Sequence, residues 1–168
     1  MRKILCYCLL SCLLCFPTLV TAQEQVIVVV RHAEKMPDSK DPQLTEAGKQ
    51  RAQHLASRLA QIKFSTAITT QYQRTQATLA PIIAQQKIDH LVVKASAPLE
   101  EHISQVSALI KQQPGNVIVA GHSNTAPLIV HALGGPDLAP LAEDEFGKLY
   151  ILFVSTTGAV SFIEAEYN

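Results

Sequence analysis

Residues 26–30 read Val-Ile-Val-Val-Val and are followed directly by Arg31 and His32. Five consecutive β-branched residues are typical of a strand that is buried on both faces, as in the middle of a parallel sheet. In open α/β sheets, ligands bind at the carboxyl ends of such strands. Arg31 and His32 therefore stand where this class of fold carries its functional groups. The alternative is that they only begin a solvated loop.

The rest of the chain alternates between helical and strand patterns. We expect helices over 45–61, 73–84, 98–113 and 125–133, and strands over 64–70, 90–93, 116–120, 149–155 and 159–165. Pro81 lies inside the second helix and is expected to kink or shorten it. Ala77, Ala80 and Ile83 are the residues that we expect that helix to bury. Strands alternating with helices predict an α/β fold in three layers, with a central, mostly parallel mixed sheet flanked by helices and an antiparallel hairpin at its edge.

Residues 1–22 have the pattern of a secretory signal peptide: a basic start, an apolar stretch, and small residues at the two positions that signal peptidase recognises before the bond after Ala22. We therefore expect cleavage after Ala22, a secreted or periplasmic location, and one domain at 23–168. Two alternatives are an uncleaved membrane anchor, for which the apolar stretch is short, and lipidation at Cys12.

Cleavage at this point changes the composition of the chain. All four cysteines lie within residues 1–22, so the remaining chain has no disulfide, no thiolate zinc site and no cysteine nucleophile. It carries 12 basic and 14 acidic side chains, a net charge of −2, with no basic run. These features argue against binding to nucleic acid or to an anionic membrane surface. We expect no stable membrane insertion after cleavage and no metal or other cofactor.

Two buried strands end in histidine, at Arg31-His32 and at Gly121-His122, and a third leads to Arg74. Neighbouring strands would bring both imidazoles to one edge of the sheet, where helix N-termini add backbone N–H groups. A guanidinium group fits phosphate oxygens with two parallel hydrogen bonds. A neutral histidine can attack phosphorus, and a second can hydrogen-bond the transferred group. The residue types therefore predict a phosphoryl site.

Four segments, in this order and spacing, resemble the motifs of the histidine phosphatase superfamily, which has the phosphoglycerate mutase-like fold. The first matches the branch whose signature reads Arg-His-Ala-Glu-Lys. Together the four span nearly the whole chain after the signal peptide. They are Arg31-His32-Ala33-Glu34-Lys35, Leu44-Thr45-Glu46-Ala47-Gly48-Lys49-Gln50-Arg51-Ala52, Arg74-Thr75-Gln76-Ala77-Thr78 and Gly121-His122-Ser123-Asn124-Thr125.

The resemblance implies a role for each matching residue. His32 would be the nucleophile that is transiently phosphorylated. Arg31 and Arg74 would clamp the phosphoryl group, and His122 would complete the pocket and stabilise the transition state. The family needs no metal. Two further residues are implied to line the pocket: Thr45 and Asn124.

The acid that protonates the leaving group is not clearly matched. Family members often carry it as a carboxylic acid in a Leu-x-Glu context, which Glu101 provides here without the glycine that often follows. Glu101 is equally consistent with a solvated helix residue. Glu34, next to the nucleophile, is the alternative acid, or else a structural partner of Lys35 or of an arginine. If neither acts, good leaving groups such as a phosphohistidine or an acidic phosphoester are favoured.

Other polar residues are expected to have no role in the site. We interpret the remaining histidines as surface residues: His54, His90, His102 and His131. Residues 143–145, Glu-Asp-Glu, form a solvated acidic turn or one wall of the pocket. Ser123 lacks the final glycine of a nucleophile elbow, which argues against a serine esterase.

The sequence thus predicts an extracytoplasmic, metal-independent phosphatase with a small phosphorylated substrate. Mutase activity is disfavoured because the chain is short and leaves little room for a lid. The alternative function is a catalytically weak phosphate- or phosphosugar-binding protein of the same fold.

Overall fold

The computed structural model of the protein describes residues 24–37, 39–95 and 98–167. The expected signal peptide and the four cysteines lie outside this range. No helix in the described part of the chain is long and apolar enough to span a membrane.

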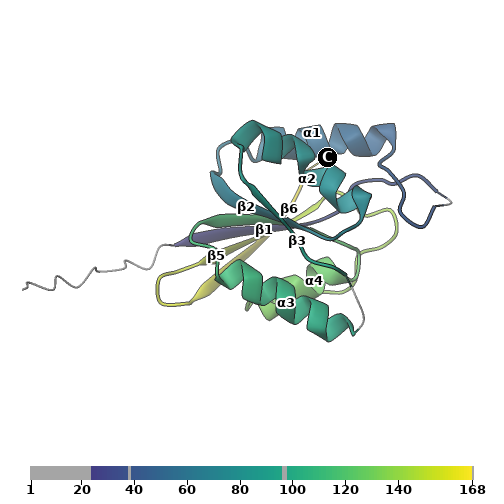
Figure 1. The fold of residues 1–168 in the computed structure, drawn as a ribbon. Coiled ribbons are helices and arrows are strands. Elements are labelled where there is room, and N and C mark those ends of the chain that lie inside the picture. Colours follow the sequence, from purple (N-terminus) through teal and green to yellow (C-terminus); the bar gives the residue numbers. More distant parts are fainter. Residues whose placement is uncertain (1–23, 38, 96–97, 168) are drawn as a thin grey trace, which may run out of the picture.

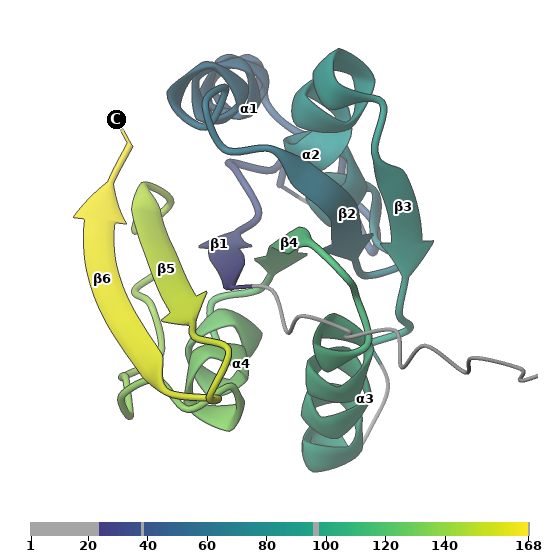
Figure 2. The ribbon, with the colours of Figure 1, turned by 90° about the vertical axis from the view of Figure 1, so that its left-hand side faces the viewer.

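The described residues alternate strands and helices as the sequence pattern predicts. The elements are β1 (Gln25–Arg31), α1 (Glu46–Arg58), β2 (Phe64–Thr69), α2 (Gln73–Gln86), β3 (Asp89–Val92), α3 (Leu99–Lys111), β4 (Asn116–Gly121), α4 (Thr125–Ala132), β5 (Lys148–Val154) and β6 (Val160–Glu166). The strands form one sheet in the order β3-β2-β4-β1-β5-β6 (Figure 2). The four strands from β3 to β1 are parallel, and β5 and β6 are antiparallel to their neighbours. The predicted three-layer fold with a mixed sheet is confirmed.

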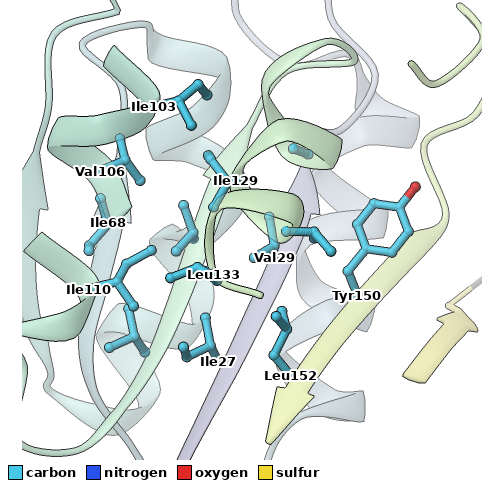
Figure 3. Packing of buried hydrophobic residues seen from close by; sticks show 14 of the residues in the cluster. Ile27, Val29, Ile68, Ile103, Val106, Ile110, Ile129, Leu133, Tyr150 and Leu152 are labelled. Atoms are coloured by element: carbon cyan, nitrogen blue, oxygen red, sulfur yellow. The ribbon is translucent and has the colours of Figure 1, made fainter. Parts of the chain in front are cut away.

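Helices cover both faces of the sheet, with α1 and α2 on one side and α3 and α4 on the other (Figure 1). The central strand β1 serves both layers, because its side chains alternate between the two faces. Val28 and Val30 pack with residues of α1 and α2, whereas Ile27 and Val29 pack with Ile129 and other residues of α3 and α4 (Figure 3). This double burial explains the unbroken apolar run in the sequence.

The second helix differs from the sequence-based expectation. Pro81 lies within α2 without ending it, and the helix continues to Gln86. Its buried residues are also not the expected ones: Ala80 is exposed and Ala77 and Ile83 are only partly buried. Thr75 bonds the hydroxyl of Thr70, and Thr78 accepts from the N–H of Ala33, so α2 turns these threonines rather than the alanines toward the core. The residues that α2 buries are Thr75, Thr78, Leu79 and Ile82.

Candidate active site

The ends of β1 and β4 bring the two predicted site histidines together. The strands are parallel neighbours in which Arg31 pairs with Gly121, and the backbone N–H of His32 donates to the carbonyl of Gly121 at 2.9 Å. The rings of His32 and His122 lie 5.4 Å apart, centroid to centroid, with an angle of 67° between their planes. The edge of the sheet therefore holds two imidazoles in contact, ninety residues apart in sequence.

His32 has the protonation state that a nucleophile needs. Its side chain is 4% exposed, and its Nδ1 lies 2.8 Å from the carbonyl oxygen of Ala33. This contact assigns the proton to Nδ1 and leaves a lone pair on Nε2. Burial, and then the positive charges of Arg74 and Arg31, lower the pKa of His32 to about 4. The imidazole is therefore neutral at neutral pH.

Arg74, the second residue of α2, orients His122. Its Nη2 lies 3.4 Å from Nδ1 of His122, which must accept because a guanidinium only donates. The proton of His122 is then on Nε2, which lies 3.2 Å from Oγ1 of Thr70. The guanidinium of Arg74 also stacks on the ring of Tyr72, 4.2 Å from its centroid. Burial, with the charge of Arg74, lowers the pKa of His122 to about 3.

Arg31 is held by the loop that precedes β5, a contact that the sequence did not predict. Its side chain is 2% exposed and donates to the carbonyl of Ala142 and, at 3.1 Å each, to those of Glu143 and Glu145. The guanidinium stacks on Phe146, 4.2 Å from the ring centroid. Residues 142–146 thus form a wall of the site through backbone oxygens and one ring. The side chain of Glu143 is 94% exposed at 3.7 Å from Arg31, and that of Glu145 accepts from the N–H of Ala142 at 2.7 Å.

Both arginines keep one donor unpaired. The Nε atoms of Arg31 and Arg74 are buried and have no hydrogen-bond partner, two of only four such side-chain atoms in the described residues. A buried donor without a partner costs about 1–3 kcal/mol. The charges of both guanidinium groups act on His32, so the site carries a positive potential that suits an anionic ligand.

Thr45 caps α1 beside the nucleophile's strand. Its Oγ1 accepts from the N–H of Gly48 at 3.0 Å, and its own N–H donates to the carbonyl of Glu34 at 2.9 Å. A Cβ on Gly48 would lie 2.2 Å from that carbonyl oxygen, so only glycine allows α1 to approach the segment after His32 so closely. Thr45 therefore holds α1 against this segment, and its hydroxyl is already engaged.

The two predicted acids lie in different surroundings. Glu34 pairs with Arg51, with Nη2 to Oε1 at 2.8 Å. Burial raises its pKa, but the hydrogen bonds and charge of Arg51 outweigh this, so the pKa is lowered. This pairing opposes the protonated form that an acid catalyst requires. Glu101 is exposed on α3 and accepts from Gln105 at 3.1 Å.

A hollow of about 260 Å³ lies beside His122. It is lined by Tyr72, Arg74, Ala95, Leu99, His102, His122, Asn124 and Thr125. Asn124 thus borders the site as expected from the resemblance, whereas neither Glu34 nor Glu101 lines this hollow.

The expectation that His102 is a surface residue is wrong. It is 2% exposed, because it precedes Val106 by four residues and shares the face of α3 that packs on the sheet. That spacing is the signal in the sequence that could have identified it. The other three histidines outside the site are exposed: His54, His90 and His131. The ring of His90 also bonds the hydroxyl of Thr69 at 2.8 Å. The described residues contain no group of three side chains that could hold a metal ion.

Comparisons with known proteins agree with this geometry. The family model of the histidine phosphatase superfamily (branch 1) matches residues 27–106, which include Arg31, His32 and Arg74. His122 lies beyond that match, and the fold brings it to the other three. No sequence among the curated proteins matches the chain.

Several solved structures share the fold at low sequence identity. The protein histidine phosphatase SixA complexed with tungstate aligns with a TM-score of 0.67 and 16% identity, over 84% of this chain and 96% of its own. A candidate phosphohistidine phosphatase SixA from Agrobacterium tumefaciens aligns with a TM-score of 0.62 and 22% identity, over 82% of this chain and 95% of its own. A phosphoserine phosphatase from Entamoeba histolytica in complex with 3-phosphoglyceric acid aligns with a TM-score of 0.62 and 12% identity, over 86% of this chain and 97% of its own.

The fold is thus that of the phosphoglycerate mutase-like α/β proteins. The family match over residues 27–106 and the fold of these neighbours confirm the resemblance predicted from the sequence, which is to the histidine phosphatase superfamily.

Proposed function

We propose that the protein is a metal-independent phosphatase that hydrolyses a small phosphomonoester or a phosphohistidine through a phosphohistidine intermediate at His32. One observation carries this proposal: the bare Nε2 of a neutral, buried His32 lies in a site where two buried guanidinium Nε atoms have no partner. A nucleophile and two unpaired cationic donors together suit a phosphoryl group.

The reaction follows from these positions in two steps. In the first, Nε2 of His32 attacks phosphorus, and the bond to the leaving group breaks. Arg31 and Arg74 stabilise the charge on the transferred group, and His122, oriented by Arg74 and Thr70, completes the pocket around it. In the second, water attacks the phosphohistidine, releasing phosphate and restoring neutral His32.

The similar structures support an oxyanion site in this fold. One of them holds tungstate, a tetrahedral oxyanion like phosphate, and its protein is described as a protein histidine phosphatase. Another is in complex with 3-phosphoglyceric acid. The substrate of this protein is therefore proposed to be a small phosphorylated molecule.

The direct test compares the protein from Gln23 onward with its His32→Ala variant on p-nitrophenyl phosphate, in the presence of EDTA. We expect turnover by the parent, none by the variant, and an acid-labile, base-stable phosphoenzyme after rapid quenching of the parent only. His131→Ala, at an exposed site on α4, is the matched control and should retain parental turnover. Turnover by His32→Ala at the parental rate would refute the covalent mechanism.

A second function is favoured by the placement of the acids. Because Glu34 is bound by Arg51 and Glu101 is exposed, a binding protein with weak turnover is the alternative. It would give one equivalent of p-nitrophenol without steady turnover, while inorganic phosphate raises the melting temperature.

We further propose that the enzyme acts outside the cytoplasm after cleavage behind Ala22. The support is the pattern of residues 1–22. Expression of the full chain in a bacterial host, cell fractionation and mass determination of the product test this. A periplasmic product that begins at Gln23 is expected. A cytoplasmic product that retains Met1 would contradict the proposal.

A further inference from the structure

A third imidazole, that of His102, borders the site and is not used by the mechanism above. It lines the hollow beside His122 together with Arg74, on the side of α3 where a carboxylic acid was sought in the sequence. The imidazoles of His102 and His122 line this same hollow.

The orientation of His102 is fixed by one hydrogen bond. Its Nδ1 lies 3.1 Å from the carbonyl oxygen of Lys94, so Nδ1 carries a proton and donates. Within the described chain nothing bonds to Nε2, and Nε2 is also not among the buried atoms that lack a partner. Because Lys94 engages Nδ1 and His102 lines the hollow, Nε2 is the ring nitrogen left to act toward it.

We propose that His102 is a further catalytic residue, which gives a proton to the leaving oxygen from Nε2, and that the hollow receives the leaving group of a small, unactivated alkyl phosphate. This inference rests on the proposed phosphatase function and names its substrate class.

The proton balance of the two steps is complete with this residue. As Nε2 of His32 bonds to phosphorus, the P–O bond to the alcohol breaks and the oxygen takes the proton from Nε2 of His102. The departing alcohol leaves neutral His102 behind. In the second step Nε2 of His102 takes a proton from water as the water oxygen bonds to phosphorus and the P–N bond breaks. The charged His102 then returns this proton to the departing phosphate, so both histidines end neutral. Nδ1 of His102 keeps its bond to Lys94 throughout.

The substrate supplies the first proton. Burial lowers the pKa of His102, partly offset by the carbonyl of Lys94, so the free enzyme holds the residue neutral. A phosphomonoester has a second pKa of about 6 and arrives at mildly acidic pH as a monoanion. Its proton passes to Nε2, and the dianion that remains favours the charged imidazole beside it.

The lining of the hollow indicates the leaving group. Its volume of about 260 Å³ suits a small group. Beside Arg74, Thr125 and the two histidines, its lining includes the polar Tyr72 and Asn124 and the apolar Ala95 and Leu99. No carboxylate is among the described residues that line the hollow, and Arg74 adds a positive charge, which disfavours a cationic leaving group. A neutral, small alcohol fits this surface. The sequence favoured good leaving groups only if neither Glu101 nor Glu34 acts as the acid, and His102 would supply that acid instead.

The test compares substrates with different leaving groups. For His102→Gln we expect kcat/KM on glycerol 3-phosphate to fall by about 10²–10⁴-fold, the usual contribution of a general acid. On p-nitrophenyl phosphate, whose leaving group needs no proton, kcat/KM of the same variant should fall by less than about threefold. His90→Gln, outside the hollow, is the control and should change neither. An equal loss on both substrates, or no loss, would overturn the proposal.

A second measurement uses the parent protein, so it does not depend on whether the buried variant His102→Gln folds. Across a series of alkyl and aryl phosphates, proton donation predicts a shallow dependence of kcat/KM on the pKa of the leaving group, and a steep one would refute it. The two proposals fail in different ways. Loss of the phosphohistidine at His32 refutes the phosphatase mechanism, whereas a phosphoenzyme that forms with a steep dependence refutes only the role of His102.

Discussion

Arg51 holds the carboxylate of Glu34 through two of its nitrogens. Its Nε lies 2.9 and 3.0 Å from the two carboxylate oxygens, and its Nη2 lies 2.8 Å from one of them. Its Nη1 donates to the carbonyl of Tyr167 at 3.1 Å. One guanidinium group in α1 therefore joins the segment after the nucleophile to the C-terminal segment, which packs its aromatic ring in the core.

Replacement of Arg51 should therefore lower stability. We expect Arg51→Ala to reduce the free energy of unfolding by about 1.5–3 kcal/mol, the range for a hydrogen-bonded charged group, because the pair is about three-quarters buried. Urea denaturation measures this. The control is Lys49→Ala, which removes an exposed pair with Glu46 and should cost less than about 1 kcal/mol. Equal effects of the two changes would contradict the structural role of Arg51.

The site histidines predict a pH dependence of stability. The unperturbed pKa is about 6.5, and the folded values are about 4 for His32 and about 3 for His122. Between the folded and the unfolded pKa of each histidine, the unfolded chain binds more protons than the folded one, so stability rises with pH there. Stability is thus full above about pH 6.5 and is lost as pH falls toward 4. The lowered pKa of Glu34 adds a loss in the same direction at lower pH.

Urea midpoints between pH 7 and pH 4 check this sign. The parent should lose stability steadily over that range. The double variant His32→Asn, His122→Asn should show a shallower dependence, because Asn does not titrate. His131→Asn, an exposed control, should keep the parental dependence. A double variant with the parental slope would show that these two residues are not the source.

The sequence predicted those parts of the molecule that depend on local pattern. The apolar run at residues 26–30 and the segment at 116–120 identified the two central strands, and the residues after them identified the paired histidines. Contacts between distant segments were not predictable in this way. Arg31 bonds a loop 111 residues away through backbone carbonyls, which carry no sequence signal. The partner of Glu34 was foreseen only as an unspecified arginine, since periodicity does not identify a partner across the fold.

Phe146 should act on ligand binding through Arg31. Its ring lies 4.2 Å from the guanidinium carbon, and such contacts contribute about 0.5–2 kcal/mol. We expect Phe146→Ala to weaken inorganic phosphate binding by about 3- to 30-fold, which corresponds to this range of energy. Isothermal titration calorimetry measures it. Phe153→Ala, an exposed aromatic residue on β5, should leave phosphate affinity unchanged. Unchanged affinity in Phe146→Ala would show that the ring does not support Arg31.

Thr70 and Thr69 provide a matched pair of variants for the orientation of His122. Both threonines are buried and each contacts a histidine: Thr70 contacts His122 at 3.2 Å, and Thr69 contacts His90 at 2.8 Å. Only the first contact lies in the site. Replacement by valine keeps the shape and removes one hydroxyl, at a cost of about 1 kcal/mol of stability for Thr69 and a larger cost for Thr70, whose Oγ1 also bonds Thr75 at 2.9 Å.

Their effects on catalysis should therefore separate. Without its partner, the Nε2–H of His122 is no longer held in the tautomer that Arg74 and Thr70 select. We expect Thr70→Val to lower kcat and kcat/KM together by about 5- to 10-fold, the equivalent of one hydrogen bond, with KM unchanged. Thr69→Val should retain parental kinetics. Equal losses in the two variants would mean that the effect comes from stability of β2 and not from the orientation of His122.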